Sequence, residues 1–201
     1  MNNILILYPS QFKCSGKFER KLSSILQNID SFSILFKHDK NNLISDFFST
    51  NFPEVKLVEN IDLKINEITH AIIFDDGEEF FEETKLIENN EIPLRKIRIK
   101  ITRVINIKEN PQYKNQKSTQ EYEYIGRGSY WGNPYSMYES GEDRDEVIRK
   151  YKYDFDFDLF PNKEKSKIYE LAGKKLGCFC KPASCHGDIL ADFLNSYDDG
   201  N

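Results

Sequence analysis

The sequence has no apolar stretch long enough to span a bilayer. It also lacks a surplus of basic residues, since 28 Lys and Arg stand against 33 Asp and Glu for a net charge of −5. Residues 1–107 hold 14 basic and 16 acidic residues, and residues 108–201 hold 14 and 17. We therefore expect no membrane contact and no binding to duplex nucleic acid, which requires cations to neutralise phosphates. A small anionic ligand is still compatible, because a pocket does not need a basic surface.

The chain also lacks the marks of a secreted protein. Residues 1–8 contain no basic segment and no small-residue cleavage site, so we expect no secretory signal peptide. We therefore expect a cytoplasmic protein, in the host cytoplasm if it is viral, whose four cysteines stay reduced. Reduced cysteines that cluster are expected to bind a metal, to react, or to pack without a chemical role, rather than to form disulfides.

Apolar runs and amphipathic segments alternate through the first half of the sequence. Strands are predicted at residues 4–7, 32–36, 55–58, 70–74 and, from an alternating pattern, 95–104. Apolar residues at helical spacing predict helices at residues 17–29, 42–52 and 79–89. Strands that alternate with helices predict an α/β fold, whose right-handed crossovers connect the strands of a parallel sheet.

A polar stretch without aliphatic residues, residues 108–120, predicts a linker or long loop. After it, the sequence predicts a strand at residues 122–125 and helices at residues 143–153, 163–171 and 187–194. We therefore predict a Rossmann-like scaffold at residues 1–107, the linker, and a compact module at residues 121–201. The predicted fold class is α/β, with an N-terminal parallel sheet flanked by helices and a small α+β module at the C-terminus.

Two turns follow the first and fourth predicted strands. They are Tyr8-Pro9-Ser10 and Asp75-Asp76-Gly77. On these positions the first half resembles the SLOG superfamily, Rossmann-like domains related to lysine-decarboxylase-like nucleotide phosphoribohydrolases. The resemblance implies a Gly-Ser-Arg turn after the first strand and a Gly-Thr turn after the Asp-Gly pair. Here Tyr8-Pro9-Ser10 and Glu82-Glu83-Thr84 stand instead, and carboxylates repel phosphate. Two interpretations of the first half are therefore kept: a scaffold that has lost its ligand site, and a working nucleotide site.

Three of the four cysteines lie within eight residues of one another, next to a histidine. One hypothesis is a zinc site, with Cys178, Cys180, Cys185 and His186 as its ligands. Another is a reactive thiol: Cys185 precedes a predicted helix, whose N-terminus favours a thiolate, and His186, Asp188 and Cys180 lie nearby as catalytic partners. The third is a crowded turn whose thiols have no chemical role. The spacing of these residues in the sequence does not discriminate among the three hypotheses.

A glycine-rich segment, residues 126–134, follows the strand predicted at residues 122–125. Its glycines allow the backbone to approach a ligand, Arg127 offers a planar fork for a phosphate or carboxylate, and Trp131 can stack on a base. A tight turn whose Trp131 fills the core is the structural alternative. The residues predicted to bind a ligand are Gly126, Arg127, Gly128, Ser129, Trp131 and Asn133.

The order and spacing of these two motifs form a recognisable pattern. It comprises residues 124–129, 131–134, 173–182 and 185–190. On this pattern the second half resembles the family of phage and bacterial proteins catalogued as domain of unknown function 4326. The resemblance implies a viral or phage-like protein and no particular activity. Where the family usually has Trp between the first two cysteines, this sequence has Phe179, which keeps an aromatic ring.

Together these features predict the binding or processing of a nucleotide or nucleotide-derived molecule. The predicted site joins the loop at residues 126–134 to the segment at residues 178–188. Its acid, base and thiol groups suit attack at a glycosidic or phosphate-linked centre. Zinc is the one cofactor that the residues suggest. The runner-up is a non-enzymatic, zinc-stabilised or thiol-rich module that binds a host protein or nucleic acid through the acidic stretch at residues 154–158.

Overall fold

A computed structural model describes the chain except for residues 1, 60–61, 63, 138–140, 161–162 and 201. The chain divides into two compact units: Met1–Ile99 with Ser196–Asn201, and Lys100–Asn195. None of the helices among the described residues is long and apolar enough to cross a membrane. The predicted fold class, α/β with a parallel sheet flanked by helices and a smaller second module, is confirmed.

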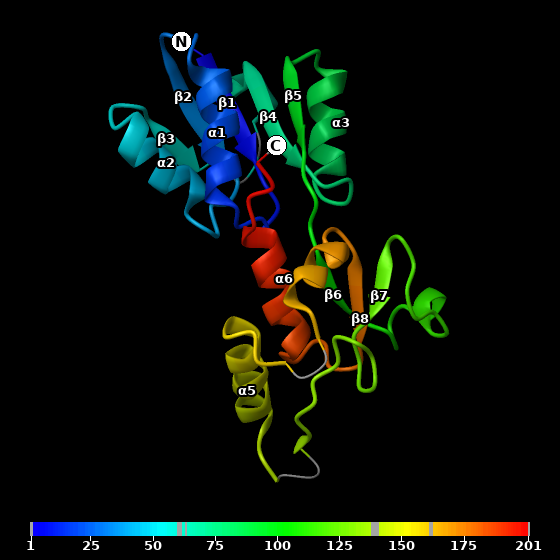
Figure 1. Ribbon diagram of the computed structural model, residues 1–201. Coiled ribbons are helices and arrows are strands. Elements are labelled where there is room, and N and C mark those ends of the chain that lie inside the picture. Colours follow the sequence, from blue (N-terminus) through cyan, green and yellow to red (C-terminus); the bar gives the residue numbers. More distant parts are fainter. Residues whose placement is uncertain (1, 60–61, 63, 138–140, 161–162, 201) are drawn as a thin grey trace. The chain divides into compact units, whose positions relative to one another are not determined.

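The first unit is built on a five-stranded sheet whose paired strands are all parallel. Its strands are β1 (Asn2–Leu7), β2 (Phe32–Phe36), β3 (Leu57–Glu59), β4 (His70–Asp75) and β5 (Leu94–Arg98). They lie in the order β3-β2-β1-β4-β5 (Figure 1). Because the chain moves outward from β1 in one direction and from β4 in the other, the strand order reverses between β1 and β4. This is the topological switch point at which Rossmann-like sheets bind ligands.

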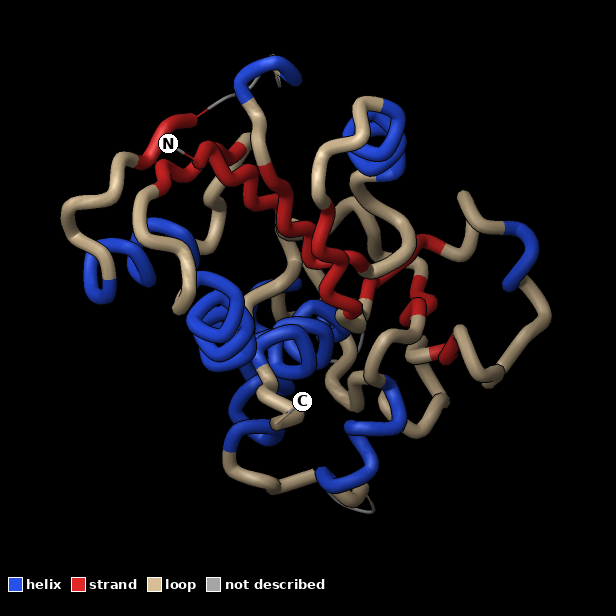
Figure 2. The backbone as a smooth tube through the Cα atoms, turned by 90° about the horizontal axis from the view of Figure 1, so that it is seen from above, coloured by secondary structure: helices blue, strands red, loops and turns tan. Residues whose placement is uncertain are grey.

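Helices α1 (Ser15–Leu26), α2 (Leu43–Asn51) and α3 (Phe81–Asn89) connect these strands, with the 3-10 turn η1 (Ile65–Glu67) before β4. Figure 2 shows helices on both sides of the strands. On one face Phe18 of α1 stacks on Phe74 of β4, with ring centroids 5.0 Å apart. On the other face Ile87 of α3 packs with Leu5 and Ile73. Both faces are covered, which explains why the central strands β1, β2 and β4 contain continuous apolar runs.

The second unit contains a three-stranded sheet in the order β6-β8-β7. Its strands are β6 (Arg103–Asn106), β7 (Tyr122–Tyr124) and β8 (Lys175–Cys178), and β8 pairs in parallel with both neighbours. The helical elements are η2 (Pro111–Tyr113), α5 (Arg144–Asp156), η3 (Lys165–Leu171) and α6 (His186–Ser196). Because all three strands run the same way, their carboxyl ends meet at one edge of the sheet.

The core of the second unit joins this sheet to α5 and α6. Ile125, Tyr151 and Leu176 are buried there, together with Trp131 and His186. At Gly187, a Cβ atom would lie 2.5 Å from Cδ1 of Ile125, so the first turn of α6 approaches the sheet as closely as a glycine permits.

The single strand predicted at residues 95–104 is wrong, because this segment forms β5 of one sheet and β6 of the other. The break lies at Thr102, whose N–H donates to Oδ1 of Asn195 at 2.8 Å and whose C=O accepts from Nδ2 of the same side chain at 3.0 Å. These bonds use the backbone groups that a continuous ladder would need. The helix predicted at residues 163–171 is the 3-10 helix η3.

Candidate functional site

A cavity of about 390 Å³ lies in the second unit, where β7 and β8 end. Its walls come from three segments: residues 126–137 after β7, residues 144–148 of α5, and residues 178–186 between β8 and α6. The position follows from the topology, because ligands of parallel sheets bind beyond the carboxyl ends of the strands. The two motifs singled out in the sequence therefore border one space.

The glycine loop folds as two successive tight turns. Gly126 C=O accepts from the N–H of Ser129 at 3.1 Å, and Ser129 C=O accepts from the N–H of Gly132 at 3.1 Å. Gly128 has a φ of +79°, a conformation that side-chain-bearing residues rarely adopt. A Cβ atom at Gly132 would lie 2.6 Å from the Gly126 oxygen. Both glycines are thus required for the compact turn that brings Arg127 to the cavity.

A second cavity of about 300 Å³ borders the same loop and is lined by residues that include Ser129 and Lys163. Arg127 and Asn133 line both cavities. Among the described residues the buried Oγ of Ser129 has no hydrogen-bond partner. Lys163 Nζ donates to the Gly132 oxygen at 2.8 Å, and burial lowers the pKa of this amine although Asp154 opposes the shift. A cation and an unsatisfied hydroxyl in one recess are suited to an anionic group.

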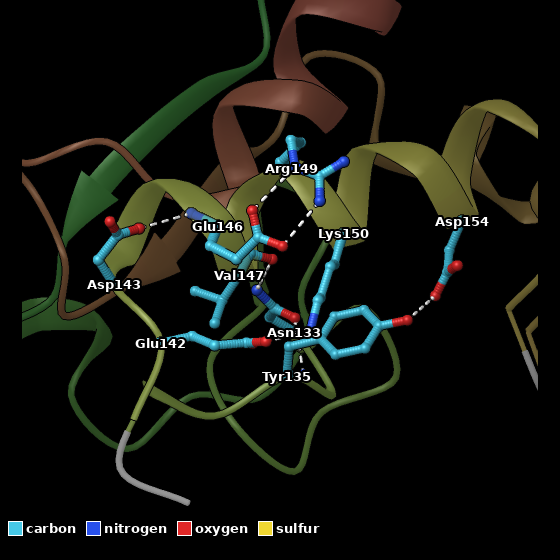
Figure 3. A network of polar contacts seen from close by, with 9 residues as sticks. All are labelled: Asn133, Tyr135, Glu142, Asp143, Glu146, Val147, Arg149, Lys150 and Asp154. Atoms are coloured by element: carbon cyan, nitrogen blue, oxygen red, sulfur yellow. Dashed lines mark hydrogen bonds and ion pairs between the residues drawn. The ribbon is translucent and has the colours of Figure 1, made fainter. Parts of the chain in front are cut away.

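The chain after the glycine loop is anchored on α5 by a network of polar contacts (Figure 3). Asn133 donates from Nδ2 to the C=O of Val147 at 3.1 Å and accepts at Oδ1 from the N–H of Tyr135 at 2.9 Å. Tyr135 in turn donates its hydroxyl to Asp154 at 2.6 Å. At the start of α5, Asp143 accepts from the N–H of Glu146 at 2.8 Å, as an N-cap residue does. These contacts hold the cavity wall in place.

The three clustered cysteines come together in space. The Sγ atoms of Cys178, Cys180 and Cys185 all lie within 4.8 Å of one another, and those of Cys178 and Cys185 are 3.5 Å apart. The turn between them is closed by the N–H of Ala183, which donates to the Cys180 oxygen at 3.0 Å. His186, the fourth predicted zinc ligand, is not part of this group of sulfur atoms within the described part of the chain.

The electrostatics of the cluster favour a thiolate at Cys178. The hydrogen bond shared with Cys185 and the N–H groups of Cys180 and Lys181 lower the Cys178 pKa to about 6, although burial opposes this shift. The same hydrogen bond, together with burial, raises the pKa of Cys185. Burial also raises the pKa of Cys180. Of the two hydrogen-bonded thiols, Cys185 is thus the one whose pKa is raised, although it precedes a helix.

His186 and Asp188 have structural partners. His186 Nε2 lies 2.8 Å from the Ile125 oxygen, which can only accept, so Nε2 bears the proton. Burial lowers the pKa of His186 to about 4, so the ring is neutral at pH 7. Asp188 accepts from the N–H of Cys185 at 2.9 Å and from Lys181 Nζ at 2.5 Å. The carboxylate thus returns to the residue that precedes α6, as in a capping box.

Trp131, predicted to stack on a ligand, lies instead in the hydrophobic core with 3% of its surface exposed. Its C=O accepts from the hydroxyl of the buried Tyr151 at 3.0 Å. Sequence reasoning also missed several residues of the cavity walls: Tyr135, Met137, Arg144, Val147, Ile148 and, in the second recess, Lys163. The sequence did contain one indication that α5 lines a cavity, because Arg144 lies on the same helical face as the apolar residues Val147 and Ile148.

At the switch point of the first unit, hydrogen bonds from side chains of the protein close the turn after β1. Tyr8 donates its hydroxyl to Asp39 at 2.5 Å, and Asn41 Nδ2 donates to the backbone oxygens of Ser10 and Phe12, each at 2.8 Å. These contacts fix the turn after β1 in the absence of a glycine-rich loop.

The turn after β4 is likewise closed by its own carboxylates. Asp76 Oδ1 accepts from the N–H groups of Glu78 at 3.1 Å and Glu79 at 3.0 Å. The adjoining cavity, lined by Tyr8, Lys37 and neighbouring residues, has a volume of about 110 Å³. Sites for small organic ligands usually measure about 300–1,000 Å³. This geometry favours the scaffold interpretation of the first unit.

Comparison with known proteins supports this two-part organisation. The chain is 40% identical over 72 residues to an uncharacterized 12.4 kDa protein in the nrdA-td intergenic region of Enterobacteria phage T4. The match covers 35% of this chain and 65% of that protein. No solved structure matches the chain. Residues 105–196 match a domain of unknown function (DUF4326), and residues 1–105 match the minimal SLOG domain, a class of nucleotide-related binding modules. The chain therefore belongs to the minimal SLOG domain family and joins that domain to a domain of unknown function (DUF4326).

Proposed function

We propose that the second unit binds a small anionic, nucleotide-like ligand at the carboxyl edge of its sheet. The observation that supports this most strongly is the pair of cavities that share Arg127 and Asn133. In this proposal the anionic group lies in the recess with Arg127, Lys163 and the unsatisfied Ser129 hydroxyl. The remainder of the ligand lies in the larger cavity. Because the relative is a phage protein, we place this activity in the cytoplasm of an infected cell.

The size and chemistry of the larger cavity suit such a ligand. Its volume of about 390 Å³ falls within the usual range for small organic molecules, about 300–1,000 Å³. Val147, Ile148 and Phe179 supply apolar surface, and Arg144 adds a second cation. A flat, largely apolar group with an anionic end, as in a nucleotide, complements this arrangement.

The same geometry favours binding over covalent catalysis. Asp188 is engaged in capping α6, and His186 is neutral with its Nε2 proton donated to Ile125. The sulfur that favours the thiolate, Cys178, is 1% exposed. A nucleophile must reach its substrate, so we assign the unit a recognition role.

The proposal is tested by isothermal titration calorimetry against a panel of nucleoside mono-, di- and triphosphates. Any ligand that binds is then titrated into Arg127→Ala. Loss of a hydrogen bond to a charged group costs about 1.5–3 kcal/mol, which corresponds to a 10- to 150-fold weaker affinity. Arg149→Ala is the matched control, since Arg149 on α5 pairs with Glu146 and does not line either cavity. No binding across the panel, or equal affinity in the two variants, would refute the proposal.

A protein-binding role is the second candidate, because the end of α5 exposes aromatic rings among acidic residues. Tyr153 and Phe157 are 54% and 62% exposed, with ring centroids 4.7 Å apart. Exposed aromatic residues of this kind are frequent at interfaces. Cross-linking in infected-cell extract, compared with Tyr153→Ser and Phe157→Ser, tests this role. A partner captured equally by the variants would exclude the surface.

A further inference from the structure

The cysteine cluster has the geometry of a metal site in which the protein supplies three ligands. A tetrahedral zinc ion with bonds of about 2.3 Å holds its sulfur ligands about 3.8 Å apart. Here one pair of sulfurs is 3.5 Å apart and all three lie within 4.8 Å. Changes of at most about 1 Å in the sulfur–sulfur distances would bring them to the required spacing. The sequence spacing of Cys178 and Cys180 is shorter than in common zinc motifs. The turn between Cys180 and Cys185 nevertheless brings the three sulfurs together.

We propose that Cys178, Cys180 and Cys185 together bind one thiophilic divalent ion, Zn²⁺ in the first instance. This proposal does not depend on the nucleotide-like ligand, since it rests on the positions of the three sulfurs alone. It also differs from a Cys3His site, because His186 lies outside the group of ligand atoms found among the described residues.

The surroundings of the sulfurs are those of metal-bound thiolates. The N–H of Cys180 donates to Cys178 Sγ at 3.3 Å, a bond that orients the sulfur and lowers its charge density. Arg144, which donates to the Ser184 oxygen at 3.2 Å, also borders the cavity and lies close enough to Cys180 to favour its thiolate. Lys181 lies close enough to interact with both Cys178 and Cys185. Two cations therefore offset the excess negative charge of three thiolates around one divalent ion.

The fourth coordination position is left to a molecule in the cavity. The neighbouring protein groups are already committed, Nε2 of His186 to Ile125 and the carboxylate of Asp188 to Cys185 and Lys181. All three cysteines border the cavity of about 390 Å³, so water or a ligand atom there can complete the tetrahedron. Three protein ligands with one exchangeable position is the arrangement of zinc ions that act on bound molecules.

The test uses the full chain, purified reduced and without metal, and titrated with Co²⁺ as a spectroscopic substitute for zinc. We expect one ion per chain, a thiolate-to-cobalt charge-transfer band, the intense visible absorption of tetrahedral cobalt, and displacement by Zn²⁺. Cys180→Ser should weaken the affinity by about 100-fold or more, since loss of partners outside the coordination shell already costs 10- to 100-fold. Cys180→Ala serves as a second variant, and circular dichroism confirms that both variants fold.

Cys14→Ser is the matched control, because Cys14 is a free cysteine that lies at the N-cap of α1 in the other unit and is replaced there by a good N-cap residue. It should bind the ion as the unsubstituted chain does. Absence of stoichiometric binding to the reduced chain would overturn the proposal. So would equal affinity of Cys180→Ser and Cys14→Ser. Nucleotide titrations of the metal-free chain are a separate readout, so failure of one proposal is distinguishable from failure of the other.

Discussion

Replacement of Asp39 by alanine should destabilise the first unit by more than an ordinary surface substitution. The carboxylate accepts from the N–H groups of Ile44 at 3.0 Å and Ser45 at 2.8 Å, at the start of α2. It also accepts the hydroxyl of Tyr8, which is only 5% exposed. Loss of the cap costs about 1 kcal/mol, and leaving the buried Tyr8 hydroxyl without an acceptor for its proton costs about 1–3 kcal/mol. We therefore expect Asp39→Ala to lower the free energy of unfolding by about 2–4 kcal/mol.

The effect should also depend on pH. Burial raises the Asp39 pKa, but hydrogen bonds from Ser45, Tyr8 and two backbone N–H groups outweigh it, so the folded-state pKa is lowered. A carboxylate with a lowered pKa stabilises the fold above its unfolded pKa of about 3.9, and that stabilisation is lost as the pH falls through the folded value. The difference between the native chain and Asp39→Ala should therefore shrink in acid.

The assay is urea unfolding followed by circular dichroism, combined with hydrogen exchange of the amides of α2. Trp131, the only tryptophan, lies in the second unit, so its fluorescence is not the appropriate probe. Asp39→Asn keeps a side-chain acceptor and should lose only about 1 kcal/mol. If Asp39→Ala unfolds at the same urea concentration as the native chain, with unchanged exchange at residues 43–51, then side chains do not hold the turn after β1 as the structure indicates.

Two further predictions concern the second unit. Gly187→Ala should lower the free energy of unfolding of the second unit by about 1–3 kcal/mol, because the new methyl group would overlap Ile125. Urea unfolding followed by Trp131 fluorescence measures this loss, and an unchanged midpoint would contradict the prediction. In the metal-free chain, Cys180 should be alkylated by iodoacetamide before Cys178, because Cys180 is partly exposed whereas Cys178 is buried. Peptide mass spectrometry identifies the modified thiol, and earlier modification of Cys178 would show that its lowered pKa outweighs its burial.

The sequence predicted much of the first unit, because its signals are local. The apolar run at Ile4–Leu7 is a buried strand since helices cover both faces of the sheet, and the stripe through Phe18 and Leu22 is the buried face of α1. The carboxylates near Asp76 were expected to repel a phosphate, and in the structure the N–H groups of Glu78 and Glu79 donate to Asp76.

What the sequence did not predict depends on contacts between distant residues. The break at Thr102 requires Asn195, which lies 93 positions away. The strand β8, at Lys175–Cys178, is short and contains glycine, so no periodic pattern marks it. The helix after Cys185 predicted that this thiol could be activated, but it could not predict the hydrogen bond between Cys185 and Cys178. Such a bond exists only once β8 and α6 are packed together.

The most direct test of the proposed function is to locate a ligand on the chain by nuclear magnetic resonance. Backbone amide shifts would be followed while nucleoside phosphates are added to the isotope-labelled protein, with and without Zn²⁺. We predict saturable shift changes concentrated at residues 126–136 and 178–186, which border the cavities of the second unit. Shift changes concentrated instead at residues 8–10 and 37–40 would place the site at the switch point of the first sheet and contradict the proposal, as would the absence of any change.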